Sequence, residues 1–227
     1  MAETAVTIIT VQGEAHARRT AERAIVSLSA TVSGPDRDPV VDAVATAASA
    51  ITALITADLD PTAGPIVRFS ADRAHVWSDR PWNQQGEQLP LVFHATIAIT
   101  AEFSDVEALS RFVETASRTE HVAVGTISWE LTDETRRDLE TQVRGDAVLA
   151  AVEKARQFAA AVGFDRVSPI AIADPGMLGD GGSASGPQGK FASPMMARAG
   201  MDSAPAFNFT PGEIVVSAAV DARFAAS

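Results

Sequence analysis

The sequence contains no cysteine among its 227 residues. This absence excludes disulfide bonds, thiolate metal sites, iron–sulfur clusters and cysteine nucleophiles at once. Long apolar runs are lacking too, since no stretch approaches the roughly 20 apolar residues that a membrane-spanning helix requires. We therefore expect a protein without a membrane span, held together by packing rather than by covalent cross-links.

Basic residues are scarce relative to acidic ones. Lys and Arg number 18 against 29 Asp and Glu, which gives a formal net charge of -11 and a pI near 4.7. An acidic protein repels phosphate backbones, and no cluster of Lys and Arg offsets that repulsion. The charge therefore argues against a nucleic-acid partner.

The start of the chain lacks the marks of a targeting segment. Residues 1–7 contain neither a basic region nor an uninterrupted apolar stretch before a small-residue cleavage site. This predicts no signal peptide, so we expect a cytoplasmic location. With 46% apolar and 21% charged residues, the composition is typical of a globular protein. The length predicts one domain over residues 1–227, either undivided or built from two closely joined subdomains.

Eight segments have the β-branched, alternating pattern of strands. In the sixth, Ile127 and Trp129 share one face while Thr126, Ser128 and Glu130 share the other. The predicted strands are Val6–Gln12, Ala24–Val32, Ile66–Phe69, Ala74–Ser78, Pro90–Phe103, Ala123–Leu131, Ser168–Ala173 and Gly212–Phe224.

Three segments predict helices. The first runs from about Pro39 to Ala57 with Asp38 as its N-cap. The second opens with a capping box in which Ser104 and Glu107 satisfy reciprocal backbone donors. The third runs from Asp133 to Val162, begins at the N-cap Thr132 and stops at Gly163. Its apolar stripe is expected to be Leu139, Val143, Ala147, Ala151, Ala155, Phe158 and Val162.

The order of these elements predicts an α+β protein with antiparallel or mixed sheets packed against three helices. The strand that ends at Leu131, the long third helix and the strand Ser168–Ala173 together predict an α/β crossover unit. The many alanines of that helix indicate close packing against a sheet or a partner helix.

A long segment, 175–210, separates the last two strands. Of its 36 residues, 21 are Gly, Pro, Ser or Ala, and it holds four of the five methionines. Loops beyond about 15 residues are usually functional or disordered. The apolar side chains in this loop therefore predict part of an interaction surface, formed by Met177, Met195, Met196, Met201 and Phe207.

The segment Trp77–Trp82 holds two Trp residues in polar surroundings that include Arg80. Trp77, Arg80 and Trp82 could form a recognition surface. The alternative is a hairpin whose aromatic side chains cover the sheet. We add these three residues to the predicted interaction surface.

Motifs for catalysis and cofactor binding fail on inspection. Gly179–Ala184 matches a relaxed dinucleotide fingerprint, but no helix opens after it. Gly186–Lys190 lacks the first glycine and the hydroxyl residue of a P-loop, and Gly182–Gly186 has Ala184 where a nucleophile elbow needs serine. The histidines His16, His75, His94 and His121 are scattered and lack metal-ligand spacing. We expect no cofactor, metal or catalytic site.

Acidic residues open the third helix, in a pattern that superficially suggests paired catalytic carboxylates. The helix dipole and pairing with nearby arginines explain them more simply. These acidic residues are Asp133, Glu134, Asp138 and Glu140.

The whole arrangement resembles the SIMPL-domain family, whose biochemical activity is undetermined. The likeness is carried by Ile9–Glu14, by Ile127–Leu131 with Ala147–Gly163, and by Pro211–Phe224. The resemblance implies a related fold, and it implies assembly into oligomers, because bacterial members can form rings. Some members are linked to stress tolerance and one eukaryotic member to kinase signalling. The family supplies no catalytic residue to transfer.

We therefore expect a non-enzymatic protein that forms homo-oligomers and acts through protein contacts, with a link to stress and a partner that the sequence does not identify. The alternative is a small-molecule binder or an unrecognised enzyme, with segment 175–210 as a lid over a cleft near Trp77 and Trp82. A third hypothesis, a signalling adaptor, rests on family analogy.

Overall fold

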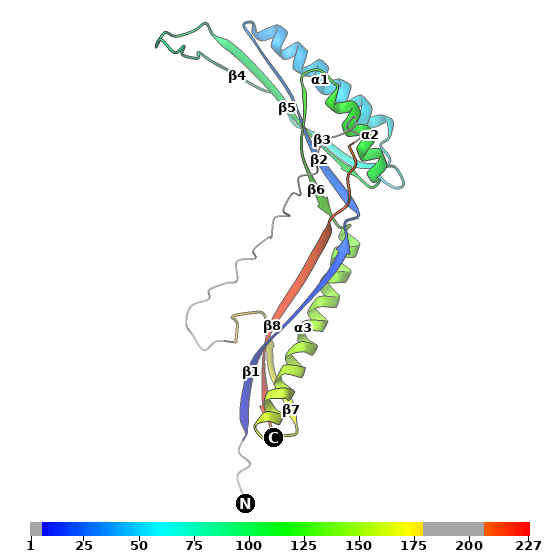
Figure 1. Ribbon diagram of the computed structural model, residues 1–227, viewed down its shortest axis with the longest axis vertical. Coiled ribbons are helices and arrows are strands. Elements are labelled where there is room, and N and C mark those ends of the chain that lie inside the picture. The colour runs from blue at the N-terminus through cyan, green and yellow to red at the C-terminus, as the bar shows by residue number, and fades with distance from the viewer. Residues whose placement is uncertain (1–5, 179–206) are drawn as a thin grey trace, which may run out of the picture. The chain divides into compact units, whose positions relative to one another are not determined.

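A computed structural model describes residues 6–178 and 207–227, and these residues form three helices and two antiparallel sheets (Figure 1). The predicted α+β class is confirmed. The helices are α1 (Arg37–Ala57), α2 (Val106–Ser117) and α3 (Asp133–Ala161). The strands are β1 (Thr7–Thr20), β2 (Arg23–Gly34), β3 (Ile66–Ala71), β4 (His75–Asp79), β5 (Val92–Phe103), β6 (Val122–Glu130), β7 (Val167–Ala173) and β8 (Glu213–Ala226).

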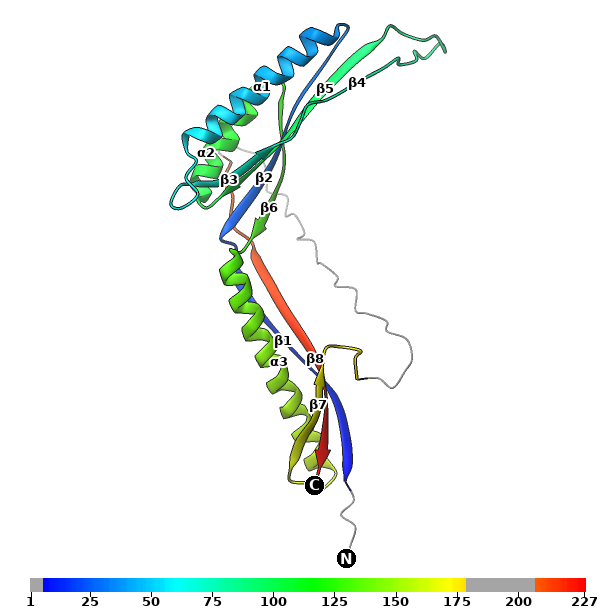
Figure 2. The ribbon, with the colours of Figure 1, turned by 180° about the vertical axis from the view of Figure 1, so that it is seen from behind.

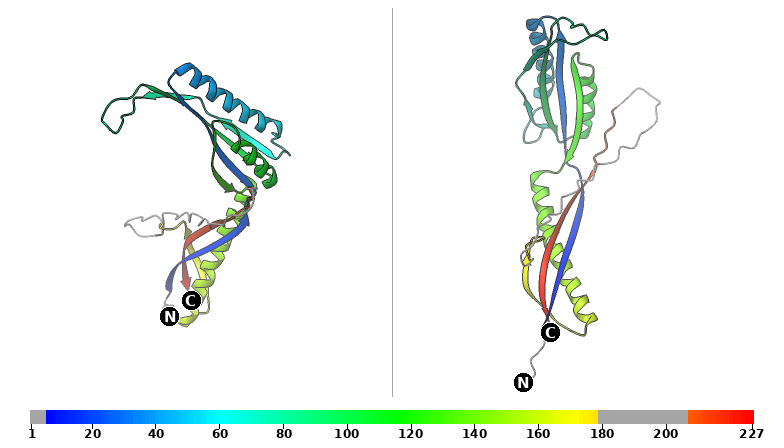
Figure 3. Two further views of the ribbon diagram at one scale, coloured as in Figure 1. Left: turned by 45° about the horizontal axis from the view of Figure 1, so that its top comes forward. Right: turned by 90° about the vertical axis from the view of Figure 1, so that its left-hand side faces the viewer.

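The chain divides into two compact units (Figure 3). Unit 1 combines the two ends of the chain with α3 and β7, over residues 1–19, 132–202 and 214–227. Unit 2 comprises residues 20–131 and 203–213. The middle of the sequence is thus inserted into unit 1, between β1 and α3. The expectation of one domain over residues 1–227 stays a prediction.

The predicted crossover is wrong. β6 belongs to the five-stranded sheet of unit 2, whereas β7 belongs to the three-stranded sheet of unit 1. Because α3 leaves one sheet and leads to the other, it joins no two strands of one sheet. Strand β7 instead pairs antiparallel with β8, starting from Val167 opposite Ala226. Sequence order alone did not reveal this pairing.

Unit 2 is a sheet covered by helices on one face (Figure 2). Its strand order is β3-β5-β2-β6, with β4 also paired to β5. Along the central strand β2, the buried side chains Val26, Leu28 and Ala30 alternate with the more accessible Ser27 and Ser29. The buried face packs against α1 and α2, and the ring of Phe103 on β5 lies 5.1 Å from that of Phe112 on α2. On the opposite face, β2 carries hydroxyl side chains, Ser27 and Ser29 among them.

Helix α1 is long and apolar enough to satisfy a length-and-composition test for a membrane span, with a mean hydropathy of 1.8. Its side chains Val44, Ile51 and Ile55 are fully buried and belong to the core of unit 2. The core helix of a soluble protein satisfies the same test. The burial of these three side chains shows that α1 packs into the core of unit 2.

Unit 1 is a sheet of order β1-β8-β7 with α3 against one face. Gly13 of β1 lies so close to α3 that an added Cβ would clash with the Ala147 carbonyl oxygen and come within 2.8 Å of the Ala151 Cβ. The predicted close approach of the alanine-rich helix is thus confirmed, and glycine on the strand makes it possible.

The apolar stripe of α3 ends differently from the prediction. Phe158 and Val162 are exposed, and Ala159 is buried in their place. Four-residue steps advance about 40° around an α-helix, because each residue turns about 100°. Such a stripe winds around the helix, as a twisted sheet requires of its partner. The buried side chains of α3 are Leu139, Val143, Ala147, Ala151, Ala155 and Ala159.

Helix ends show which capping predictions hold. Thr132 caps α3 through its side chain, and Gly163 follows the helix at φ 87°, both as predicted. The predicted cap of α1 is wrong by two residues, since Asp36 occupies that position and Asp38 lies within the first turn. First-turn N–H groups have no partner within the helix, so Pro39 is tolerated there.

The predicted capping box of α2 is also wrong. Asp105 is the N-cap, and its carboxylate accepts a hydrogen bond from the Ala108 amide at 2.7 Å. The Ser104 hydroxyl instead donates to the Gly64 carbonyl at 2.8 Å. Asp and Ser are comparable caps, and an ionised carboxylate gains further from the helix dipole.

Candidate interaction surface

The predicted surface residues that the structure describes are divided between the two units. Trp77, Arg80 and Trp82 lie on β4 and the segment after it, in unit 2. Met177 lies in the turn after β7, in unit 1, and Phe207 lies in unit 2 ahead of β8. The other three predicted residues, Met195, Met196 and Met201, lie outside the described residues.

Trp77 belongs to an aromatic row on the face of the unit 2 sheet away from the helices. The row comprises His75, Trp77 and His94; the Trp77 ring centroid lies 5.0 Å from that of His75 and 5.1 Å from that of His94, with the rings stacked. Trp77 is opposite His94 in the β4–β5 register, so these side chains project from the same face. This position fits the interpretation of Trp77 as an aromatic side chain that covers the sheet.

Hydrogen bonds hold His94 in the aromatic row. Its Nδ1 lies 2.8 Å from the Ser33 hydroxyl of β2, and its Nε2 lies 3.0 Å from an Asp79 carboxylate oxygen of β4. Side chains from the two flanking strands, β2 and β4, therefore fix the imidazole ring of His94 on β5. The sequence placed the histidines apart, and only the strand register brings His75 and His94 to the same Trp.

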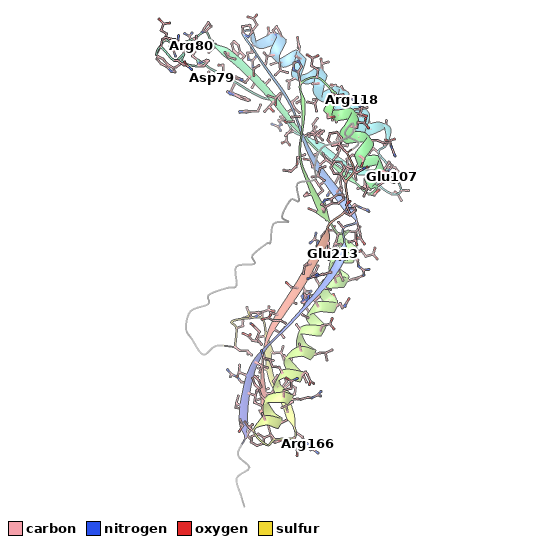
Figure 4. All side chains as sticks on the ribbon, viewed as in Figure 1. Asp79, Arg80, Glu107, Arg118, Arg166 and Glu213 are labelled. Atoms are coloured by element: carbon pink, nitrogen blue, oxygen red, sulfur yellow. The ribbon has the colours of Figure 1, made fainter. Side chains whose placement is uncertain are left out.

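Trp82 has a different environment, in a segment that we call the arm (residues 80–91, between β4 and β5). Figure 4 labels Arg80 at its start. Asn83 orders the tip of the arm. Its side-chain oxygen accepts hydrogen bonds from the Gln85 amide at 3.0 Å and the Glu87 amide at 2.8 Å. Trp82 and Gln88 form a β-bridge. The arm is thus ordered by its own hydrogen bonds, yet the Trp82 side chain is 66% exposed.

A groove of about 450 Å³ lies at the other edge of the same sheet. We call it the β6 groove. The consecutive residues 122–125 all line it, and since neighbours on a strand point to opposite faces, the groove follows the edge of β6 rather than either face. Its lining is Val113 and Ser117 of α2, Val122, Ala123, Val124, Gly125 and Ile127 of β6, and Phe207 and Phe209.

Two aromatic rings form one wall of the β6 groove. The rings of Phe207 and Phe209 are stacked with centroids 6.3 Å apart. Phe209 packs against the core of unit 2, while Phe207 is 37% exposed. Phe207, which was predicted as a surface residue, therefore borders the groove.

Met177 lies in a turn that is attached to the unit 1 sheet. The Gly176 amide donates to a carboxylate oxygen of Asp221 at 2.7 Å, and the Arg223 guanidinium donates to the Leu178 carbonyl at 2.9 Å. Both partners are on β8. The Met177 side chain itself is 73% exposed.

The acidic residues of α3 behave as helix-surface charges. Asp133 and Glu134 lie in the first turn, and Glu140 pairs with Arg144 at 3.1 Å. Across residues 6–178 and 207–227, no group of three or more His, Asp or Glu side chains could hold a metal ion. The glycine-rich motifs between Gly179 and Lys190 lie outside the described residues.

Sequence reasoning missed the β6 groove and the role of Asn83. The groove depends on Phe207 and Phe209 reaching β6 from about 80 residues later in the chain, which no local pattern encodes. The turn at the tip of the arm could have been predicted, because Asn83 and Gly86 are typical turn residues in a short polar stretch. Gly86 does adopt φ 79°.

Comparison with protein families finds one that covers almost the whole chain. The SIMPL family, described as a protein of unknown function (DUF541), matches residues 9–224. No curated protein matches the chain.

Proposed function

We propose that this chain, which belongs to the SIMPL family of proteins of unknown function, works by binding other folded proteins, beginning with copies of itself. The observation that carries the proposal is Trp82, a largely exposed indole on an arm that is already ordered. The proposal is one of contact rather than catalysis. A role in stress and a cytoplasmic location stay predictions of the sequence.

The arm has the physical properties of a binding element. Association normally costs free energy because side chains and loops lose conformational freedom. Here the hydrogen bonds of Asn83 order the arm before any partner arrives, so less of that cost remains. Trp is enriched among the residues that dominate protein interfaces, since one indole buries a large area. Leu89, 40% exposed on the returning side of the arm, adds apolar surface beside it.

Light scattering coupled to size-exclusion chromatography tests this proposal on the full chain. We expect a mass above the 23.7 kDa of one chain, rising with concentration, because association follows mass action. The variant Trp82→Ala should shift the mass towards one chain. Phe158→Ala, which removes an exposed aromatic ring from α3, is the matched control and should leave the mass unchanged. A wild-type chain that stays monomeric at high micromolar concentration would refute the proposal.

A second candidate, binding of a small apolar molecule, is favoured by the β6 groove. Its volume lies within the range of about 300–1,000 Å³ typical of ligand pockets, and its walls are mainly apolar. Thermal-shift screening with apolar metabolites would reveal such a ligand as a rise in melting temperature. The rise should disappear when Ala123→Arg fills the groove; a rise that persists in this variant would place the ligand elsewhere.

A further inference from the structure

We infer that the β6 groove of one copy receives Trp82 from the arm of a second copy. This inference rests on the proposed self-association and names the contact that produces it. It joins the most exposed aromatic side chain of the described residues to an apolar groove with an aromatic wall. Both features belong to unit 2, so each has a defined place in one sheet.

The chemistry of the groove suits an indole. Val122, Val124 and Ile127 supply aliphatic contacts, and Phe207 with Phe209 offers rings against which another aromatic ring can pack edge to face. A buried indole N–H needs an acceptor. The Ser117 hydroxyl in the lining donates its own hydrogen to the Glu114 carbonyl at 2.9 Å, which leaves its oxygen lone pairs available to accept.

Sheet topology prevents a copy from filling its own groove. The strand order β5-β2-β6 places the arm, which extends from β4 and β5, at one edge of the sheet and the groove at the other. The register also separates them along the strands: Phe93, just after the arm, is opposite Gly34 at the end of β2, whereas groove residues Val122 and Val124 lie opposite Ala30 and Leu28. The contact must therefore join different copies.

A contact between two different surfaces is heterologous, so each copy can act as donor and acceptor at the same time. Such contacts produce closed rings or open chains rather than an isolated symmetric pair. This property distinguishes the inference from a contact in which two arms meet each other.

Charges beside the two features are compatible with the contact. Arg80 lies two residues before Trp82 and is exposed. Glu120 follows α2, two residues before the groove residue Val122; its side chain is 88% exposed, and its carboxylate lies 3.5 Å from the Nε2 of His121. Another acidic residue near the groove, Glu114, is paired with Arg118 at 2.7 Å. Opposite charges at the rim of an interface mainly favour encounter and register.

Two variants each block one half of the contact. Trp82→Ala removes the donor side chain and leaves the groove intact. Ala123→Arg places a long charged side chain in the groove and leaves the arm intact; Ala123 is exposed, so the core is not disturbed. We expect each variant alone to weaken self-association about 30-fold or more, the effect of removing a dominant interface residue.

Mixing the two variants is the decisive measurement. The arm of Ala123→Arg should enter the groove of Trp82→Ala, so an equimolar mixture should form a dimer of two chains and nothing larger. Recovery of binding in the mixture also shows that both variants are folded. Ala98→Arg, the same change at an exposed alanine of β5, is the matched control and should assemble as the wild type does.

The results separate the two proposals. A monomeric wild type would refute self-association and this contact together. An oligomeric wild type whose mass is unchanged by Ala123→Arg would refute only the contact, and so would a mixture that remains monomeric although each variant alone fails to associate. If Trp82→Ala alone disrupts assembly, two arms meet each other and the groove is not the acceptor.

Discussion

The cores of the two units are built from side chains of different size. Unit 2 buries large side chains, among them Phe103, Ile51 and Leu109, beneath two helices. Unit 1 buries mainly the alanines of α3 against β1 and β8, and Phe224 is its one fully buried aromatic side chain among the described residues. Unit 2 is thus stabilised mainly by the burial of large apolar side chains. Unit 1 is stabilised mainly by the close packing of its helix against its sheet.

The two units should therefore be destabilised by different kinds of substitution. A core of large side chains is sensitive to truncation, because each lost group leaves a cavity. A core of small side chains is sensitive to enlargement, because backbone atoms are already in contact and cannot move aside. The three Trp residues, Trp77, Trp82 and Trp129, all lie in unit 2. Tryptophan fluorescence therefore monitors unit 2 alone, whereas far-UV circular dichroism follows the helices of both units. Unfolding of unit 1 alone should lower the dichroism signal and leave the fluorescence unchanged.

The largest expected effect is the loss of a buried ring from unit 1. Phe224→Ala should lower the free energy of unfolding by about 3–5 kcal/mol, as is typical for a buried aromatic side chain. Unfolding of unit 1 should then remove the dichroism of α3 at a denaturant concentration at which the fluorescence of unit 2 is unchanged. Phe103→Ala is the counterpart in unit 2 and should lower the denaturant concentration at the midpoint of the fluorescence transition. Equal shifts of both signals in both variants would mean that the units unfold as one.

The next largest loss of stability should come from a larger side chain in the core of unit 1. Gly13→Ala adds a Cβ that would clash with backbone atoms of Ala147 and Ala151, so we expect a loss of about 1–3 kcal/mol. Gly145→Ala is the matched control on α3, since nothing lies within 4 Å of its added Cβ. This control should stabilise the protein by about 0.4–1 kcal/mol, because glycine is costly within a helix. Denaturant titration followed by dichroism measures both, and a neutral Gly13→Ala would show that the contact is looser than the structure has it.

The smallest effect concerns the cap of α2 in unit 2. Asp105→Ala should cost about 1 kcal/mol, since it leaves the Ala108 amide without its side-chain acceptor. Ser104→Ala tests the position predicted from the sequence; it should cost less, because the hydrogen bond from Ser104 to Gly64 is exposed. Fluorescence-monitored urea unfolding compares the two variants. A larger loss of stability for Ser104→Ala than for Asp105→Ala would show that Ser104 is the cap.

Much of the local structure could be predicted from sequence. All eight strands and three helices exist, the cap Thr132 and the stop Gly163 are where the pattern places them, and Ile127 and Trp129 share the core face of β6. The cap of α2 was misplaced by one residue because Ser104 and Asp105 are equally suited to that role. Signals of this kind arise within a few residues, so the sequence expresses them directly.

The candidate site was predicted only in part. Trp77 and Trp82 looked equivalent in the sequence, and the structure places one in a stacked row and the other on an exposed arm. Their difference depends on which strand lies beside β4. Likewise, nothing near Phe207 in the sequence indicates that it borders β6.

By itself, then, the sequence determined the order and type of the elements, the acidic charge and membership of the SIMPL family. Tertiary structure alone decided that β7 pairs with β8 rather than with β6, that the chain divides into two units, and that arm and groove lie at opposite edges of one sheet. The two kinds of feature differ in how far apart along the chain the interacting residues lie. Helix periodicity, strand alternation and caps depend on neighbours in the chain, whereas strand pairing depends on competition between edges far apart in sequence, which only the folded protein resolves.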